Sequence, residues 1–337
     1  MLQRAELQAL LDKHPRAEIG HMPTPLDKLK NISAREGLNL WAKRDDCTGV
    51  AMGGNKVRQL RYYMGAAQAA NADTVFITGA IQSNFVRTTA AMAGICGMDC
   101  HVQLEERVPD VSELHRTNGN VLLDRLMGAT VHSYPEGEDE AGADAEMRRL
   151  ADGLIAKGKR PYVVHLGADK PPLGALGYVE AALELAGQLD EIGPIDEIVI
   201  PSGSALTHIG ALSGLRLLGI DIPVRGACVR RVQPVQTARV TKRIADLGKL
   251  LGVEIPLRAQ DVFLDDSMLA PGYGQFGEEV RSAIGLAAKH EGLFVDPVYS
   301  GKTLATALET HRGSGRNILF WHTGGQPAMF AYADKLV

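Results

Sequence analysis

Residues 197–207 read EIVIPSGSALT, an apolar run followed by a loop of small residues and the start of a helix. Short apolar runs of this kind, each bounded by turn residues, recur along the chain and predict strands. They lie at 74–79, 100–104, 130–134, 162–166, 197–200, 224–229, 293–295 and 317–322. Nearly continuous apolar strands that alternate with helices are typical of parallel sheets covered on both faces, so the sequence predicts an α/β fold.

Helices are predicted between these strands by apolar residues spaced three and four apart. Two such stripes follow Gly174 and Pro234 and consist of Leu176, Val179, Leu183 and Ala186, and of Val240, Ile244, Leu247 and Leu251. Another helix is predicted at 145–157, after a polar run at 136–144 that is typical of a solvated loop. The 337 residues suffice for two domains, and we place a small domain at 49–158 and a large domain at 1–48 plus 159–337.

Composition limits the partners that the protein can have. The 36 basic and 40 acidic residues give a net charge of −4, the wrong sign for a protein that binds nucleic acid. No uncharged apolar stretch reaches the ~20 residues that cross a bilayer, and the charged N-terminal segment lacks the apolar core of a secretory signal. We therefore expect a cytoplasmic protein. Cys47, Cys96, Cys100 and Cys228 lack the spacing of a zinc site, so we expect free, mostly buried thiols and no metal.

Loops that follow the predicted strands are the places to search for a ligand, because parallel sheets bind ligands beyond the carboxyl ends of their strands. Residues 79–84, GAIQSN, place polar groups at the start of a helix near Phe85, where a carboxylate would bind. A plain N-cap by Ser83 or Asn84 is the alternative. Residues 201–207, PSGSALT, suit a phosphate, although a structural turn explains them equally well. They match neither nucleotide motif that would indicate ATP or NAD.

The segment Gly53-Gly54-Asn55-Lys56 places a lysine directly after glycines that allow close backbone approach. Such a lysine suits a buried amine with a lowered pKa that can form a Schiff base, whereas a solvated lysine in the first helical turn is the alternative. Two late turns, at 296–302 and 322–325, end further predicted strands. A phosphate loop, a reactive lysine and a carboxylate cradle together describe one ligand, pyridoxal phosphate, beside an amino acid.

Five motifs resemble those of the pyridoxal-phosphate family that contains D-cysteine desulfhydrase, L-cysteate sulfo-lyase and 1-aminocyclopropane-1-carboxylate deaminase. They are GGNK at 53–56, AIQSN at 80–84, PGYG at 271–274, DPVY at 296–299 and HTGG at 322–325, and the resemblance runs in order from Thr24 to Tyr332. It implies fold type II, in which two parallel-sheet, three-layer α/β domains hold the cofactor in the cleft between them. It also implies a homodimer with a small amino acid as substrate.

The resemblance further implies roles for matching residues. Lys56 would hold the cofactor covalently and move the substrate's α-proton, Ser83 would contact the substrate carboxylate or transfer a proton, and Tyr299 would lie over the reacting carbons. Further implied cofactor contacts are Asn55, Asn84 at the ring hydroxyl, Ser300, Thr323, and the phosphate loop of Gly203, Ser204, Ala205, Leu206 and Thr207. Further implied substrate contacts are Gln82, Asn84 and Tyr273. Gln275 is expected, with Ser83, to donate a hydrogen bond to the anion at the far end of the substrate. Leu206 stands where relatives often carry glycine, which leaves the backbone donors of the loop unchanged.

Three departures from the family pattern bear on the reaction. Ser300 stands where the cyclopropane deaminases carry a glutamate that keeps the pyridine nitrogen protonated, and a neutral hydroxyl favours α,β-elimination over ring opening. Phe85 stands where D-cysteine lyases carry histidine. Lys170 adds a cation that a sulfonate would need and a thiol would not, with a solvated loop lysine as the alternative.

We therefore expect a carbon–sulfur lyase that converts L-cysteate to pyruvate, ammonia and sulfite. The alternative is D-cysteine desulfhydrase, which releases sulfide. Further alternatives are a 1-aminocyclopropane-1-carboxylate deaminase and a non-catalytic amino-acid sensor.

Overall fold

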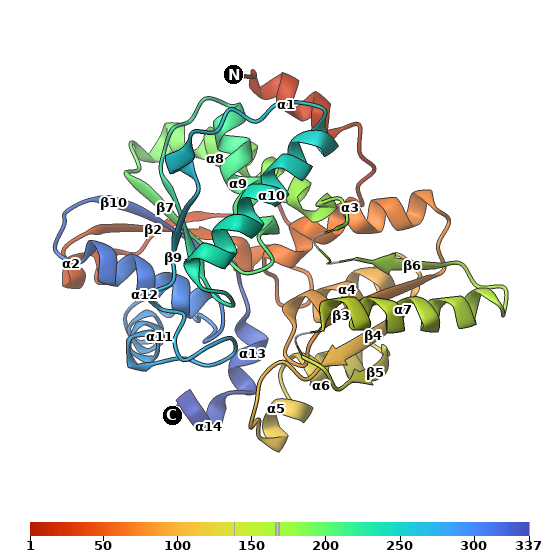
Figure 1. Ribbon diagram of the computed structural model, residues 1–337. Coiled ribbons are helices and arrows are strands. Elements are labelled where there is room, and N and C mark those ends of the chain that lie inside the picture. The colour runs from red at the N-terminus through yellow and green to blue at the C-terminus, as the bar shows by residue number, and fades with distance from the viewer. Residues whose placement is uncertain (138, 166, 168, 337) are drawn as a thin grey trace.

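The computed structural model describes residues 1–337 apart from 138, 166, 168 and 337, and it contains two sheets that lie side by side (Figure 1). The larger sheet has the order β1-β2-β10-β7-β8-β9. These strands are β1 (Leu26–Lys28), β2 (Asn39–Arg44), β10 (Asn317–His322), β7 (Glu197–Ser202), β8 (Val224–Cys228) and β9 (Phe263–Asp265). Only the pairing of β1 with β2 is antiparallel among the described strands of this sheet.

The smaller sheet is parallel throughout its described strands and has the order β5-β4-β3-β6. Its strands are β5 (Thr130–Tyr134), β4 (Asp99–Glu105), β3 (Thr74–Ala80) and β6 (Pro161–Val164). The predicted α/β class with two parallel-sheet lobes is thus confirmed.

Helices cover both faces of the larger sheet. One face packs against α1 (Arg4–Leu11), α8 (Leu176–Ile192), α9 (Leu206–Leu217) and α10 (Gln233–Leu251), and the other against α2 (Lys30–Glu36), α11 (Glu278–Glu291) and α12 (Ser300–His311). Side chains of β10 alternate between the two cores, with Leu319 and Trp321 in the first and Ile318 and Phe320 in the second. The apolar stripes predicted for α8 and α10 lie in the first core except for Ala186, which is buried outside this cluster, and Leu183 is only partly buried.

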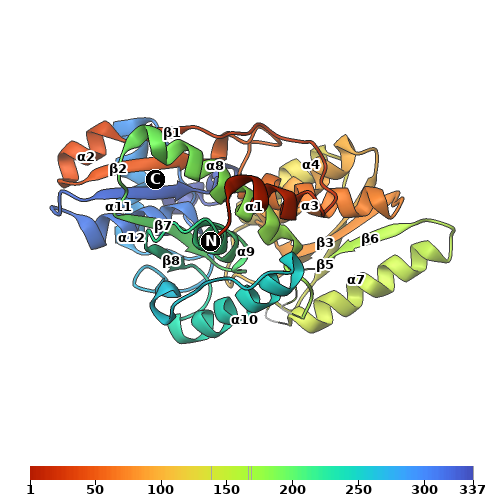
Figure 2. The same cartoon turned by 90° about the horizontal axis from the view of Figure 1, so that it is seen from above.

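The smaller sheet is also covered on both faces. The helices α3 (Asn55–Ala69), α4 (Asn84–Ile95) and α6 (Asn120–Leu126) pack on one face, and α7 (Glu140–Ile155) packs on the other through Met147 and Ala151. Because α3 contacts both α4 and α8, it joins the two lobes, as the view from above shows (Figure 2). Short helices complete the described chain at α5 (Glu113–Thr117), α13 (Gln326–Phe330) and α14 (Ala333–Leu336), with 3-10 turns at 45–47, 173–175 and 259–261.

Several boundaries differ from the predictions. The strand predicted at 293–295 is absent; Leu293 and Val295 are buried in the core without strand pairing, which explains their apolar character. The helix α7 begins at Glu140 because the Asp139 carboxylate caps it by accepting from the Gly142 N–H at 2.8 Å. The strand β6 pairs with β3, so the small lobe continues past the predicted boundary at 158, and Leu166 lies outside the described residues.

Other expectations concern the thiols and the membrane. All four cysteines are free; Cys100 and Cys228 are buried, Cys96 is half-buried and Cys47 is exposed. Across the described chain, every helix is too short or too polar to span a bilayer.

A buried ionic cluster ties the end of β2 to α3 and α8. The fully buried Asp45 carboxylate accepts hydrogen bonds from Arg58 Nε at 3.0 Å, from Tyr178 Oη at 2.5 Å and from Trp321 Nε1 at 2.8 Å. Glu184 of α8 accepts from Arg58 at 2.8 and 3.0 Å and also contacts Lys43. Burial would raise the pKa of Asp45, but the adjacent Arg58 and Lys43 outweigh it and lower that pKa. The junction of the lobes therefore depends on mutually compensating buried charges.

We expect Asp45→Ala to lower the free energy of unfolding by roughly 3 to 5 kcal/mol, because it leaves buried cations uncompensated. Urea denaturation followed by circular dichroism checks this. The matched control is Asp27→Ala, which removes a half-exposed carboxylate paired with Arg44 at 2.8 Å and should cost less than about 1 kcal/mol. Equal losses for both variants would contradict the role given to the cluster.

Candidate active site

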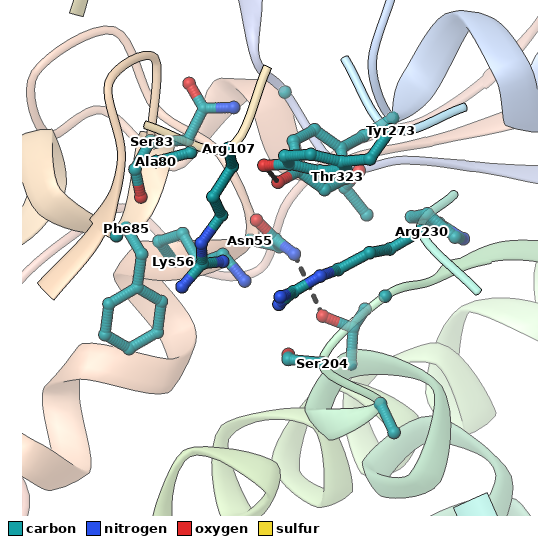
Figure 3. Close-up of a pocket in the computed structure, with 18 residues that line it drawn as sticks. Asn55, Lys56, Ala80, Ser83, Phe85, Arg107, Ser204, Arg230, Tyr273 and Thr323 are labelled. Carbon is teal, nitrogen blue, oxygen red and sulfur yellow. Dashed lines mark hydrogen bonds between the residues drawn. The ribbon is translucent and has the colours of Figure 1, made fainter. Parts of the chain in front are cut away.

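A cavity with about 850 Å³ of empty space, its open mouth included, lies between the two lobes where several strands end (Figure 3). Segments from both sheets line it, at the start of α3 and after β3, β4, β7 and β8. The described lining residues are Asn55, Lys56, Gly79, Ala80, Ser83, Asn84, Phe85, Arg107, Pro201, Gly203, Ser204, Ala205, Thr207, Arg230, Tyr273, Tyr299, Thr323 and Gly324. The position agrees with the rule that ligands bind beyond the carboxyl ends of parallel strands.

Most of the residues proposed from the sequence come together here. Those that line the cavity are Asn55, Lys56, Ser83, Asn84, Gly203, Ser204, Ala205, Thr207, Tyr273, Tyr299 and Thr323. The described lining does not include Gln82, Lys170, Gln275, Leu206 or Ser300.

Lys56 lies in the first turn of α3 and points its amine into the cavity. The backbone reaches this position through Gly54, whose φ of +116° lies in the region that favours glycine. The side chain keeps some accessible surface because it faces the cavity, yet protein surrounds the amine, and this desolvation lowers the pKa of Lys56 to about 7. Its Nζ lies 5.0 Å from the centre of the Phe85 ring and donates to Gln59 Oε1 at 3.3 Å. A large share of this amine is therefore unprotonated at neutral pH.

The loop after β7 leads into α9, and residues on both sides of the helix start, Ala205 and Thr207, line the cavity. Ala205 has a φ of +81°, which turns the chain sharply before the helix begins at Leu206. A Cβ on Gly203 would approach Val229 Cγ2 to 3.0 Å and would project toward the ring of Tyr299, so the missing side chain keeps this part of the cavity open. The first N–H groups of a helix lack intrahelical partners and bind phosphate. Thr207 adds a hydroxyl that accepts from Asn55 Nδ2 at 2.9 Å.

A second helix N-terminus, that of α4, faces the same cavity. Ser83 caps it by accepting from the Val86 N–H at 3.3 Å, so the alternative of a plain N-cap describes its contact in the structure. Asn84 Oδ1 accepts from Arg87 at 3.1 Å and from Asn120 at 3.1 Å. With that oxygen engaged, the Nδ2 amino group is the donor that Asn84 can offer to a ligand.

Two tyrosines cover another side of the cavity. Tyr273 Oη and Tyr299 Oη are 2.7 Å apart, and burial raises the pKa of Tyr299 well above its ordinary value, so its hydroxyl stays protonated. The Asp296 carboxylate fixes Tyr299 by accepting from its backbone N–H at 2.9 Å. The Lys302 amine holds the Tyr273 loop by donating to the carbonyl oxygen of Gly272 at 2.9 Å.

Three of the proposed residues support the cavity from behind. Gln82 is buried, and its Nε2 donates to the carbonyl oxygens of His115 and Asn118 at 2.6 and 2.9 Å. Leu206 packs into the core of the larger lobe. Ser300 Oγ lies 2.6 Å from Asp296 Oδ1 and 3.0 Å from the carbonyl oxygen of Gly324, so it stands directly behind a lining residue.

Lys170 does not join the site. It lines a separate cavity with Asp246, Lys249 and Leu250, and its amine lies 3.4 Å from the Asp169 carboxylate. The alternative of a loop lysine therefore describes its position, and the case for a sulfonate cannot rest on it. Ala168, in the same segment, lies outside the described residues. Gln275 is half-buried beyond the described lining.

Sequence reasoning missed two lining cations, Arg107 and Arg230. Each comes directly after a predicted strand, β4 and β8, so the search of strand-following loops could have found them. Neither arginine has a glycine or proline next to it to mark a binding loop. A charged residue at a strand end is usually solvated, so nothing in the sequence indicated that they lie in a cavity.

The donor set fits pyridoxal phosphate. The α9 N-terminus with Thr207 would hold the phosphate, the Lys56 amine would bond to the aldehyde, and Asn84 Nδ2 would donate to the ring hydroxyl. The fold and this cavity define a pyridoxal-phosphate-dependent enzyme of fold type II.

Comparison with known proteins gives the particular family. The model of the family described as "Pyridoxal-phosphate dependent enzyme" matches residues 17–324, and the chain belongs to this family. Proteins named D-cysteine desulfhydrase from Salmonella choleraesuis (strain SC-B67) and Salmonella paratyphi A are 40% and 39% identical over 96% of this chain and 97% of theirs.

Two solved structures are also similar. One described as an ACC deaminase homologue superposes with a TM-score of 0.86 at 35% identity, covering 100% of this chain and 99% of the other. A fungal L-serine ammonia-lyase from Rhizomucor miehei shares the fold, with a TM-score of 0.66 at 17% identity over 94% of this chain and 99% of its own.

Because the pKa of Lys56 is lowered to about 7, acetic anhydride should label it readily at neutral pH in the cofactor-free protein. The fraction of free amine, and with it the labelling rate, should rise about tenfold per pH unit below pH ~7 and level off above about pH 8. Peptide mass spectrometry across a pH series measures that rate. A rate that still climbs steadily between about pH 8 and 10 would contradict the desolvated environment.

Proposed function

We propose that the protein is a carbon–sulfur lyase that removes the β-sulfur substituent of a cysteine-like amino acid and yields pyruvate and ammonia. The observation that carries this proposal is the Lys56 amine, a large share of which is unprotonated near neutral pH, in a cavity whose described lining contains no Asp or Glu. The Lys56 amine supplies the base. The described lining offers no carboxylate to keep a pyridine nitrogen protonated, which favours elimination over ring opening.

D-cysteine is the substrate that the relatives' names favour, with sulfide as the leaving group. The balanced reaction consumes one water and gives pyruvate, ammonium and hydrogen sulfide. The expectation of L-cysteate was tied to Lys170, and its separate position removes that support.

Pyridoxal phosphate, when bound, supplies an electron sink that stabilises negative charge at the α-carbon of an amino acid. Lys56 would take the proton from that carbon, and its pKa of about 7 suits a group that must accept and release protons near neutral pH. The Phe85 ring, whose centre lies 5.0 Å from the amine, would shield it from water. The electron pair of the α-C–H bond then forms the α,β double bond while the sulfur group leaves with the electrons of the C–S bond.

The α4 N-terminus would orient the substrate. Its first N–H groups and the Ser83 hydroxyl face the cavity opposite the α9 terminus, and a carboxylate bound there gains from the helix dipole. The protonated Tyr299, hydrogen-bonded to Tyr273, would donate a proton to the leaving group.

The residue behind Gly324, Ser300, favours elimination over ring opening. Ser300 presents a neutral hydroxyl there, already bonded to Asp296, where a carboxylate would be needed to keep a pyridine nitrogen protonated. A milder electron sink suffices when a leaving group departs from the β-carbon as soon as the α-proton is lost.

The direct test supplies the holoenzyme with D-cysteine, L-cysteine, cysteate, β-chloroalanine and 1-aminocyclopropane-1-carboxylate, and assays pyruvate, ammonia, sulfide and 2-oxobutanoate. We expect equal amounts of pyruvate and ammonia, with sulfide from cysteine, and no 2-oxobutanoate from 1-aminocyclopropane-1-carboxylate. Lys56→Ala should abolish pyruvate formation without unfolding the protein, because it removes the base. If the wild-type enzyme forms no pyruvate from any of these β-substituted alanines, the proposed function is wrong.

A further inference from the structure

Two arginines face the cavity from opposite lobes. Arg107 follows β4 of the smaller lobe and Arg230 follows β8 of the larger one, and Figure 3 shows both side chains reaching toward the space between Lys56 and Ser204. Both residues also line a smaller adjoining cavity. Neither is needed for the roles assigned above.

Carboxylates outside the main cavity hold each guanidinium in place. Arg107 Nε donates to the fully buried Glu105 at 2.7 Å, and Arg230 Nη1 donates to Glu140 at 2.9 Å. The two arginine side chains are only 12% and 10% exposed. Glu105 and Glu140 line the adjoining cavity and not the main one. The described lining of the main cavity therefore carries two guanidinium cations and the partly protonated Lys56 amine, and no carboxylate.

The arginines also lie near the tyrosines proposed to serve the leaving group. The guanidinium of Arg230 is 5.9 Å from the centre of the Tyr273 ring, and Tyr273 is hydrogen-bonded to Tyr299. An anion held by Arg230 would thus lie beside the leaving-group side of the substrate, away from the α4 terminus proposed for the α-carboxylate.

We propose that Arg107 and Arg230 bind an oxyanion on the β-carbon of the substrate, so that the enzyme prefers a sulfonate such as cysteate to neutral cysteine. This inference rests on the proposed β-elimination and names its leaving group. Two guanidinium forks match the three oxygens of a sulfonate, whereas a thiol offers them no acceptor of comparable strength.

The reaction balances with no further reagent. The C–S bond of cysteate breaks and its electron pair leaves with sulfite, while the electrons of the α-C–H bond form the α,β double bond. The released 2-aminoacrylate takes up one water, so that cysteate and water give pyruvate, ammonium and hydrogen sulfite. Guanidinium contacts would stabilise the charge on the departing sulfite.

The binding test uses 3-sulfopropanoate, which carries the carboxylate and sulfonate of cysteate at the same spacing but has no amine to react. Calorimetry on the holoenzyme should give a dissociation constant at least about tenfold lower than that of butanoate, and the difference should shrink as salt rises. Arg230→Met should erase most of this preference and Arg230→Lys should restore part of it. Lys170→Met, which removes a cation from a separate cavity, should leave it unchanged.

Removing Arg107 alone would strand the buried Glu105, so the variant for this position is the charge-balanced pair Arg107→Met with Glu105→Gln. It should lower kcat/KM for cysteate at least about tenfold more than kcat/KM for β-chloroalanine, whose leaving group needs no oxyanion contact. This kinetic comparison is made with both enantiomers of cysteate.

Three results would overturn the inference. The first is equal binding of 3-sulfopropanoate and butanoate, and the second is an unchanged preference in both arginine variants. The third is a loss of pyridoxal phosphate affinity in Arg230→Met while 3-sulfopropanoate still binds, which would assign Arg230 to the cofactor phosphate. If the enzyme still forms pyruvate from D-cysteine in any of those cases, the proposed function is unaffected. Failure of every substrate to give pyruvate would instead refute the proposed function, while calorimetry would still report on the arginines.

Discussion

Close contact between two backbone segments determines where Lys56 lies. A Cβ on Gly324 would stand 2.6 Å from the Cα of Gly54, and the Asn55 N–H donates to the carbonyl oxygen of Thr323 at 2.9 Å. Only glycine permits this approach, since φ is +83° at Gly324 and +116° at Gly54. The first turn of α3 therefore docks on the loop after β10, which carries the lysine of one lobe onto the sheet of the other.

Charge is distributed around the cavity in a way that suits an anionic ligand. Two helix N-termini, two guanidinium groups and the Lys56 amine face it, while the carboxylates paired with the two arginines lie outside the described lining of the main cavity. Desolvation keeps the Lys56 amine reactive, and the same low-polarity environment would strengthen each contact with a phosphate, a carboxylate or a sulfonate. Specificity among sulfur substrates then depends on what Arg107 and Arg230 contact.

Local patterns predicted much of this structure, and non-local pairing accounts for most of what they missed. The GGNK and AIQSN segments follow simple rules for glycine turns and helix starts, and the sheets follow from apolar runs. The strand β2 escaped notice because Lys43 and Arg44 interrupt it, and Lys43 is compensated by Glu184, 141 residues away in sequence. Arg107 and Lys170 are both basic residues near strand ends, and each pairs with an acid one or two positions before it. Only the packing of the two lobes, which places Arg107 at the main cavity and Lys170 at a separate one, tells them apart.

The most direct test of the account is the site of cofactor attachment. Borohydride reduction of the holoenzyme followed by digestion and peptide mass spectrometry should place a pyridoxyl group on Lys56. The account predicts this modification in the peptide that contains GGNK and its absence in Lys56→Ala. A pyridoxyl group on Lys43 or Lys302, or a reduced linkage that survives in Lys56→Ala, would contradict it.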